Sequence, residues 1–226
     1  MTNLNQNGRS MIEMLGVLAI IGVLSVGGIA GYSKAMSKYR TNKMIDQATM
    51  LITNIRTMFA QQQSYTGLNN SRAVNLALVP EEMIVAPGTE MNDEDTRRLR
   101  NVFSGEVLIG SSPIDADDKG EDNKGEAAFK VSFFGISRDA CIQVATSDWG
   151  AGSSSGLIGM HIWGAEANKY KEDNVIDTTY KNGTEGSRYI AVPGDTVYKV
   201  PFTVVQAQKA CDCGNKTTCA VTWKYF

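Results

Sequence analysis

The hydrophobic pattern of the first third of the chain changes once, near residue 34. None of the 20 residues from Met14 to Ser33 is Asp, Glu, Lys, Arg or His, and apolar side chains surround the expected helix on every side. At about 1.5 Å per residue, such a helix is roughly 30 Å long, which is the thickness of a bilayer core. The pattern predicts a membrane-spanning segment.

After Lys34 the apolar residues narrow to one stripe, which predicts an amphipathic helix that packs on a layer beneath it. Gln61–Gln63 and then Gly67 indicate where this helix ends. We therefore expect one helix from Ser10 to Gln63. The stripe consists of Met36, Tyr39, Ile45, Ala48, Ile52, Ile55 and Phe59.

The remainder of the chain predicts strands, because short apolar runs alternate with turn residues and all five prolines fall after residue 79. Residues 218–226 alternate in polarity, which is typical of a half-buried terminal strand. The polar stretch 164–187 is expected to be a loop. Further strands are expected at 105–110, 127–134 and 157–163.

Two short helices are predicted from their caps. Ser137 is a suitable N-cap for a helix that reaches Ala145. Thr203 and Gln206 have the spacing of a capping box, which starts a helix toward Cys211. Gly214 is expected to end that second helix. Together with the strands, these helices indicate a mixed α+β region.

Composition narrows the class of partner. The 226 residues are 42% hydrophobic and 20% charged, with a formal net charge of −2. These averages are those of an ordinary globular protein of one or two domains. They include no basic excess that could neutralise phosphates, so nucleic acid is not expected as the main partner.

The four cysteines all follow the apolar segment, as expected for an exported domain with disulfides. Cys211 and Cys213 are poor partners for each other, because near neighbours rarely reach disulfide geometry. We expect Cys141 to bond to one of the C-terminal three, which include Cys219. Zinc is the alternative, but this Cys spacing matches no common zinc motif, and His161 is isolated.

An acidic stretch from Asp115 to Glu126 partly matches a calcium-binding loop. Lys119 stands where the loop should supply an oxygen, and the flanks are expected strands rather than helices. A solvated hairpin loop is therefore favoured, and calcium remains a weak candidate. The positions that match are Asp115, Asp117, Gly120, Asn123 and Glu126.

No catalytic set is evident in the sequence, because His161 is the sole histidine. We interpret it as a surface or edge histidine in a strand. The Gly/Ser-rich stretch 150–156 lacks the Lys of a phosphate-binding loop. The chain is therefore not expected to be an enzyme or to carry a cofactor.

The sequence from Gly8 to Glu13 (GRSMIE) is not explained by a secretory signal, which needs a cleavage site after its apolar core. It resembles the type IV prepilin signal. In that family a dedicated peptidase cuts after the glycine on the cytoplasmic side, and the mature chain keeps its apolar helix. The resemblance implies cleavage after Gly8, N-methylation of Arg9, and Glu13 as the fifth mature residue.

The remainder of the chain resembles the type IVb pilins at residues 79–83, 103–107, 139–141 and 210–226. This resemblance implies an α+β fold with a long N-terminal helical spine packed against an antiparallel sheet, and a disulfide that encloses a C-terminal region. The implied domains are a leader (1–8), a helix (9–64; apolar 14–33, amphipathic 34–64) and a head (65–226).

Two features depart from the family pattern. Arg9 stands where the family usually has an apolar residue, and the leader lacks Lys or Arg before Gly8. Both departures bear on how efficiently the new N-terminus is methylated, more than on the assignment to the family. Gly27 and Gly28 can replace the proline that many pilins carry in this span, or they are ordinary membrane-helix composition.

The resemblance implies a structural subunit of a type IV pilus that acts in adhesion, aggregation, DNA uptake or secretion. Its implied partners are further copies of itself, the prepilin peptidase and an inner-membrane assembly platform. It would be a single-pass inner-membrane protein before assembly and part of an extracellular pilus afterwards. Alternatives are a minor pilin, a type II secretion pseudopilin, or a membrane-anchored extracytoplasmic binding domain or enzyme.

Glu13 requires a reason, because a carboxylate at the edge of hydrocarbon is costly. We hypothesise that it pairs with the amino terminus of a neighbouring subunit, at Arg9, in a water-excluding filament core. The alternative is that it only offsets the helix dipole.

Overall fold

The computed structural model describes residues 11–62, 64–85, 98–113, 126–150, 156–164, 189–192, 196–199, 201–213 and 216–226. The chain divides into two compact units, Met1–Tyr39 and Arg40–Phe226. Helix α1 runs from Met11 to Phe59 and contributes to both. It ends four residues before the predicted Gln63, where the Gln62 N–H donates to the Phe59 carbonyl in a turn.

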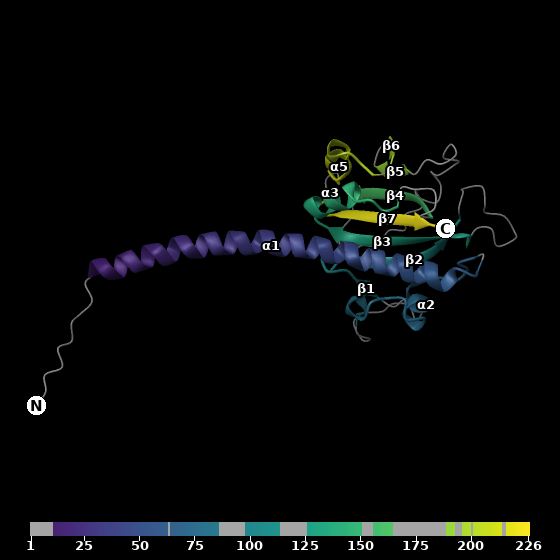
Figure 1. Ribbon diagram of the computed structural model, residues 1–226, viewed down its shortest axis with the longest axis horizontal. Coiled ribbons are helices and arrows are strands. Elements are labelled where there is room, and N and C mark those ends of the chain that lie inside the picture. Colours follow the sequence, from purple (N-terminus) through teal and green to yellow (C-terminus); the bar gives the residue numbers. More distant parts are fainter. Residues whose placement is uncertain are drawn as a thin grey trace, which may run out of the picture. The chain divides into compact units, whose positions relative to one another are not determined.

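In the second unit, α1 lies along one face of a sheet (Figure 1). The predicted stripe is right for Ala48, Ile52, Ile55 and Phe59, which are all buried. It is wrong for Tyr39, which belongs to the first unit and is 60% exposed. The other buried residues of this part of the helix are Thr41, Met44, Gln47 and Leu51.

The sheet has seven strands in the order β1-β2-β3-β7-β4-β5-β6 (Figure 1). All neighbours are antiparallel except β4 and β5, which pair in parallel. The predicted α+β class is confirmed, with this one parallel pair as an addition. The strands are β1 (Leu99–Arg100), β2 (Glu106–Ser112), β3 (Ala128–Ile136), β4 (Leu157–Gly164), β5 (Tyr189–Val192), β6 (Thr196–Lys199) and β7 (Cys219–Tyr225).

The predictions from apolar runs are confirmed for β2, β3 and β4, each within two residues at both ends. Strands β1, β5 and β6 were not predicted. Gly164 is the last residue of β4, and the remainder of the predicted loop lies outside the described residues. A parallel pair needs a crossover of a dozen residues or more, and residues 165–188 provide that length between β4 and β5.

The prediction that the terminal strand is half buried is wrong, because all seven residues of β7 are buried. The strand lies between β3 and β4 in the middle of the sheet, so both of its faces are covered. The prediction of a surface or edge histidine is also wrong. His161 lies on β4 next to β7, is 5% exposed, and stacks on Trp163 with ring centroids 4.9 Å apart.

The capped helices form as predicted. Helix α3 (Arg138–Thr146) has Ser137 as its N-cap, and the Ser137 hydroxyl accepts from the Ala140 N–H. Helix α5 (Val204–Ala210) begins with the capping box of Thr203 and Gln206. The predicted stop at Gly214 lies outside the described residues. Two short elements precede the sheet, α2 (Asn70–Asn75) and the 3-10 helix η1 (Glu81–Met83).

Candidate functional site

The first unit presents an apolar helix surface. Among the described residues, α1 is long and apolar enough to cross a membrane, and none of its most apolar 18-residue window is buried in the chain itself. The exposed apolar side chains, each 48–84% accessible, are Met11, Ile12, Met14, Leu15, Val17, Leu18, Ile20, Ile21, Val23, Leu24, Val26, Ile29 and Tyr32. Burying them is worth on the order of 15 kcal/mol or more, so this surface favours lipid or neighbouring helices over water.

Glu13 lies in the first turn of α1. A negative charge at this end of a helix interacts favourably with the helix dipole. The predicted processing residues Gly8 and Arg9 lie outside the described residues. The structure therefore places Glu13 near the N-terminal end of the apolar helix surface.

The glycines of the span leave open space around the helix. A Cβ built at Gly27, Gly28 or Gly31 would meet no atom within 4 Å among the described residues. These positions therefore leave room for another backbone to approach, and the spacing Gly27-x-x-x-Gly31 is one that permits close contact between membrane helices.

The head is fastened to α1 by polar side chains that the sequence did not single out. Gln47 is 5% exposed and bridges two segments: its Nε2 donates to Glu82 Oε1 (3.2 Å), and its Oε1 accepts from the Val102 N–H (3.2 Å). Lys43 Nζ lies 2.7 Å from the same Glu82 oxygen. The hydrogen bonds from Lys43 and Gln47 lower the pKa of Glu82.

The segment before the sheet is held in the same way. Asn54 on α1 donates to the Leu78 carbonyl (2.9 Å). The Asn70 side chain donates to the Val107 carbonyl (3.0 Å) and accepts from the Ile109 N–H (2.8 Å). These bonds join residues 64–85 to both the helix and strand β2, so the described head forms one packed unit.

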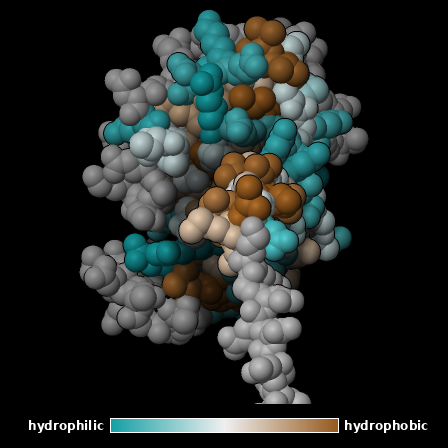
Figure 2. Space-filling model, turned by 90° about the vertical axis from the view of Figure 1, so that its left-hand side faces the viewer, coloured by the Kyte–Doolittle hydropathy of each residue, from teal (hydrophilic) through white to brown (hydrophobic). Residues whose placement is uncertain are grey.

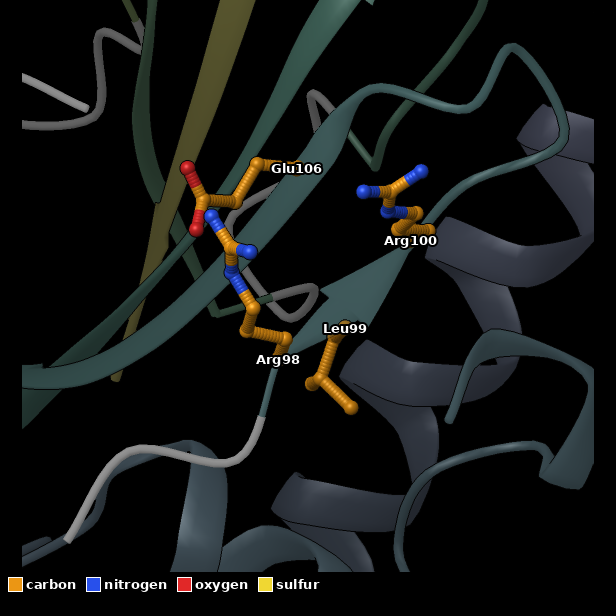
Figure 3. A pocket seen from close by; sticks show the side chains of 4 residues that line it. All are labelled: Arg98, Leu99, Arg100 and Glu106. Carbon is orange, nitrogen blue, oxygen red and sulfur yellow. The ribbon is translucent and has the colours of Figure 1, made fainter. Parts of the chain in front are cut away.

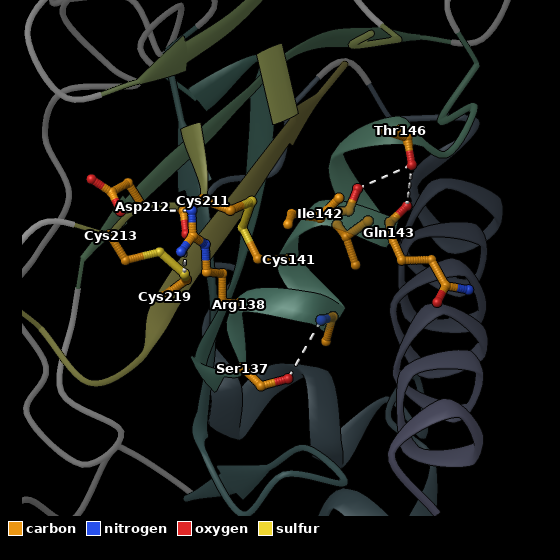
Figure 4. The surroundings of a disulfide bond; sticks show 12 residues. Ser137, Arg138, Cys141, Ile142, Gln143, Thr146, Cys211, Asp212, Cys213 and Cys219 are labelled. Carbon is orange, nitrogen blue, oxygen red and sulfur yellow. Dashed lines mark hydrogen bonds and ion pairs between the residues drawn. A yellow bond between two sulfur atoms is a disulfide. The ribbon is translucent and has the colours of Figure 1, made fainter. Parts of the chain in front are cut away.

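The cysteines form two disulfides side by side. Cys141 on α3 pairs with Cys211 at the end of α5, with Cα atoms 5.8 Å apart. Cys213 pairs with Cys219 at the start of β7, with Cα atoms 5.3 Å apart. Figure 4 shows the two bonds next to each other. They fasten α3, α5 and the last strand together.

Two contacts shape the surroundings of the disulfides. Arg138 Nη2 lies 3.8 Å from Asp212 Oδ1 across this region, and both side chains are exposed (Figure 4). Gly164 ends β4 against Cys213, where a Cβ would overlap the Cys213 carbonyl oxygen. A glycine is therefore required at that approach.

A small hollow beside β1 offers no ligand site. It is lined by Arg98, Leu99, Arg100 and Glu106 and has a volume of about 10 Å³ (Figure 3), which is the scale of one water molecule rather than an organic ligand. Arg98 points toward the Glu106 carboxylate (Figure 3). Burial raises the pKa of Glu106, and the charges of Arg98 and Arg100 oppose that shift.

The calcium candidate is mostly outside the described residues, which include Glu126 but not Asp115, Asp117 or Asn123. The Glu126 carbonyl accepts from the Tyr65 N–H (2.8 Å). Its carboxylate Oε2 is buried without a hydrogen-bond partner in the described part of the chain. The calcium site remains a weak prediction.

Apolar side chains also reach the surface of the head. Val204 and Val205 on α5 are 60% and 75% exposed. Figure 2 looks onto the N-terminal end of α1, and the brown group in the middle of that view belongs to the apolar end of this helix. Single exposed apolar residues such as Val204 and Val205 are normal on a protein surface, so the extended apolar surface of α1 is the feature that requires a partner.

Comparisons with known proteins agree with this geometry. A family model described as Bundlin matches residues 33–225. The major structural subunit of the bundle-forming pilus from Escherichia coli O127:H6 (strain E2348/69 / EPEC) is 21% identical over 213 residues, or 94% of this chain and 93% of that protein. The subunit of the same name from E. coli O111:H- has the same identity and coverage.

Two solved structures are also similar. The type IV b pilin from Salmonella typhi has a TM-score of 0.50 and 14% identity, and the match covers 81% of this chain and 98% of that one. TcpA, a type IV pilin from Vibrio cholerae El Tor, has a TM-score of 0.49 and 12% identity, covering 83% and 99%. At 14% identity, the likeness to the Salmonella protein concerns the fold alone.

Proposed function

This chain belongs to the Bundlin family, and we propose on that premise that it is the main structural subunit of a type IV pilus. Members of this family are structural pilins rather than enzymes. The observation that carries the proposal is the continuous apolar surface of α1 in the first unit, which no described residue covers. In a polymer of identical chains, each such helix buries the surface of the next.

Processing follows the prepilin pattern in this proposal. A prepilin peptidase cuts after Gly8, so that Arg9 becomes the mature N-terminus and is then N-methylated. The uncut chain is a single-pass inner-membrane protein that an assembly platform transfers into an extracellular filament. The 94% coverage of this chain by the match to a major pilus subunit supports a major rather than a minor subunit. Adhesion, aggregation, DNA uptake and secretion are the uses open to such a filament.

Glu13 sets the register between subunits in this proposal. The cut after Gly8 creates an α-amino group four residues before the carboxylate. In a water-excluding core an unpaired charge is penalised far more heavily than a paired one, since breaking a buried pair costs about 3–5 kcal/mol. Glu13 of one subunit therefore pairs with the amino terminus of the neighbouring subunit. A helix-dipole role alone is worth only about 0.3–1 kcal/mol and would not require assembly.

The test is Glu13→Val in the full chain, produced together with its peptidase and assembly platform. We expect the same amount of protein in the membrane fraction and a strong reduction in filaments sheared from the cells. Ser25→Val is the matched control, because it places the same side chain on an exposed position of the same span without removing a charge. Filament yield from Glu13→Val equal to that from Ser25→Val would contradict the register role.

Processing is tested separately by mass spectrometry of the mature chain. An N-terminus at Arg9 is the expected result. An intact Met1, or a terminus beyond the apolar segment, would reject the prepilin assignment itself.

A further inference from the structure

Two lysines and two tyrosines lie where the apolar segment of α1 ends. The uncharged part of the helix stops at Ser33. Both lysines are exposed, and the tyrosines are 66% and 60% exposed. All four belong to the first compact unit, and we call them the collar. They are Tyr32, Lys34, Lys38 and Tyr39.

We propose that the collar binds the headgroups of anionic phospholipids while the chain is in the membrane. The inference rests on the proposed function, in which α1 spans the bilayer before assembly. The headgroup layer on each side of the hydrocarbon core is about 5–7 Å thick. At about 1.5 Å per residue, Lys34 lies about 1.5 Å and Lys38 about 7.5 Å beyond Ser33 along the helix axis. Both ammonium groups therefore reach this layer.

The two lysines have no acidic neighbour on their helix. Between Glu13 and Asp46 the sequence contains no Asp or Glu, and within the described residues neither ammonium group forms an ion pair. Lys34 and Lys38 are also four positions apart, and like charges at this spacing on a helix destabilise it. A phosphate group beside both lysines reduces that repulsion. The pair is thus complementary to an anion, and phospholipid phosphates lie at the same depth.

The tyrosines of the collar suit the same layer. Tyrosine is enriched at membrane–water interfaces, because its ring is apolar and its hydroxyl forms hydrogen bonds. This placement accounts for the exposure of Tyr39, which the apolar stripe did not predict. In the proposed orientation the collar lies on the extracytoplasmic side, whereas Lys and Arg normally gather on the cytoplasmic side. Membrane topology therefore does not account for the lysines, and lipid binding does.

The experiment measures the lipid selectivity of the full chain in phosphatidylcholine vesicles. Spin-labelled phosphatidylglycerol or spin-labelled phosphatidylcholine is added as the probe, and electron spin resonance gives the fraction of each that the protein immobilises. One Lys near an anionic surface is worth about 1 kcal/mol, or about fivefold in affinity. Averaged over all lipids around the helix, we expect a preference for phosphatidylglycerol of about threefold or more. Added salt should reduce this preference, because exposed charges are screened.

The variants separate the collar from the net charge of the chain. Lys34→Gln/Lys38→Gln should lose most of the preference for phosphatidylglycerol, whereas Lys34→Arg/Lys38→Arg keeps the charge and should keep the preference. Lys209→Gln/Lys216→Gln is the control, because it removes the same charge from exposed positions of the head. It should resemble the parent chain.

Three results would overturn the proposal. If the parent chain immobilises both lipids equally, or if Lys34→Gln/Lys38→Gln keeps the full preference, the collar does not bind anionic headgroups. The membrane stage of the proposed function then still holds, because lipid is immobilised at the protein. If the parent chain immobilises neither lipid, α1 does not enter the bilayer, and the membrane stage is wrong together with the collar.

Discussion

The two disulfides should differ about twofold in their contribution to stability. They are separated by 70 residues (Cys141–Cys211) and 6 residues (Cys213–Cys219) along the chain. A cross-link restricts the unfolded chain more when it closes a longer loop. In the chain-entropy model these loops correspond to about 4.4 and about 2.3 kcal/mol at 25 °C. The Cys141–Cys211 disulfide is therefore expected to contribute about 2 kcal/mol more to the free energy of unfolding than Cys213–Cys219.

The comparison is well matched because other contributions are similar. All four cysteines are at most 5% exposed, so replacing either pair by alanine removes similar buried sulfur contacts from the native state. Both Cα–Cα distances, 5.8 and 5.3 Å, lie in the ordinary range for disulfides. Loop length is thus the main difference between the two pairs.

The assay is urea unfolding of residues 40–226, the second compact unit, produced in an oxidising compartment. Fluorescence of Trp149 and Trp223 reports the transition, because the rings lie 4.7 Å apart in the core. With a slope of about 2 kcal/mol per molar urea, the midpoint should fall by about 2.2 M for the long-loop double variant and about 1.2 M for the short-loop one. Equal shifts, or a larger shift for the short loop, would refute the reasoning.

Two further predictions concern other contacts of the head. Gly164→Ala should lower the free energy of unfolding by about 1–3 kcal/mol, because the new Cβ overlaps the Cys213 carbonyl oxygen. Gly110→Ala is the control, because the nearest atom to its new Cβ is 3.9 Å away and its urea midpoint should hardly fall. Equal losses of stability in the two variants would contradict this prediction. Glu82 has a lowered pKa in the folded state, so its contribution to stability is present above its ordinary value of 4.5 and is lost as the pH falls through the folded pKa. Lys43→Met should therefore be less stable than the parent at neutral pH, with the gap in thermal midpoint narrowing in acid; a gap independent of pH would count against the ion pair.

Local signals predicted much of this fold because they act over a few residues. The Ser137 cap and the Thr203–Gln206 capping box each depend on a contact three residues away, and both were right. The long helix was predicted for a similar reason, since apolar periodicity is a property of one segment. The helix end was less certain because fraying termini depend on their surroundings.

Long-range features escaped the sequence because nothing local distinguishes them. Gln47 looks like an ordinary polar residue of an amphipathic helix, yet it is buried between Glu82 and the Val102 N–H. The polar side chains of β7, Thr222 and Lys224, suggested a solvent-facing side, but both are 0% exposed. Alternation reveals a strand, whereas its place within the sheet is decided by pairing with distant segments.

The candidate site divides in the same way. The apolar surface and Glu13 are features of one helix and were visible in the sequence. The cysteine cluster was only half visible, because the sequence favoured Cys141 bonded to a C-terminal cysteine but left three possible partners. The proximity of the two disulfides depends on the packing of α3 against α5, which no spacing rule encodes.

The position of β7 links the two halves of the sheet. It is the last strand in sequence but lies between β3 and β4, so without it the sheet would divide into β1-β2-β3 and β4-β5-β6. Its end is fastened by the Tyr225 hydroxyl, which donates to the Trp149 carbonyl (2.9 Å), and by Arg56 of α1 over the Tyr225 ring at 5.8 Å. Burial raises the pKa of Tyr225, so the hydroxyl keeps its proton and remains a donor. The sheet therefore becomes continuous only when β7, which follows the other six strands in sequence, pairs with both β3 and β4.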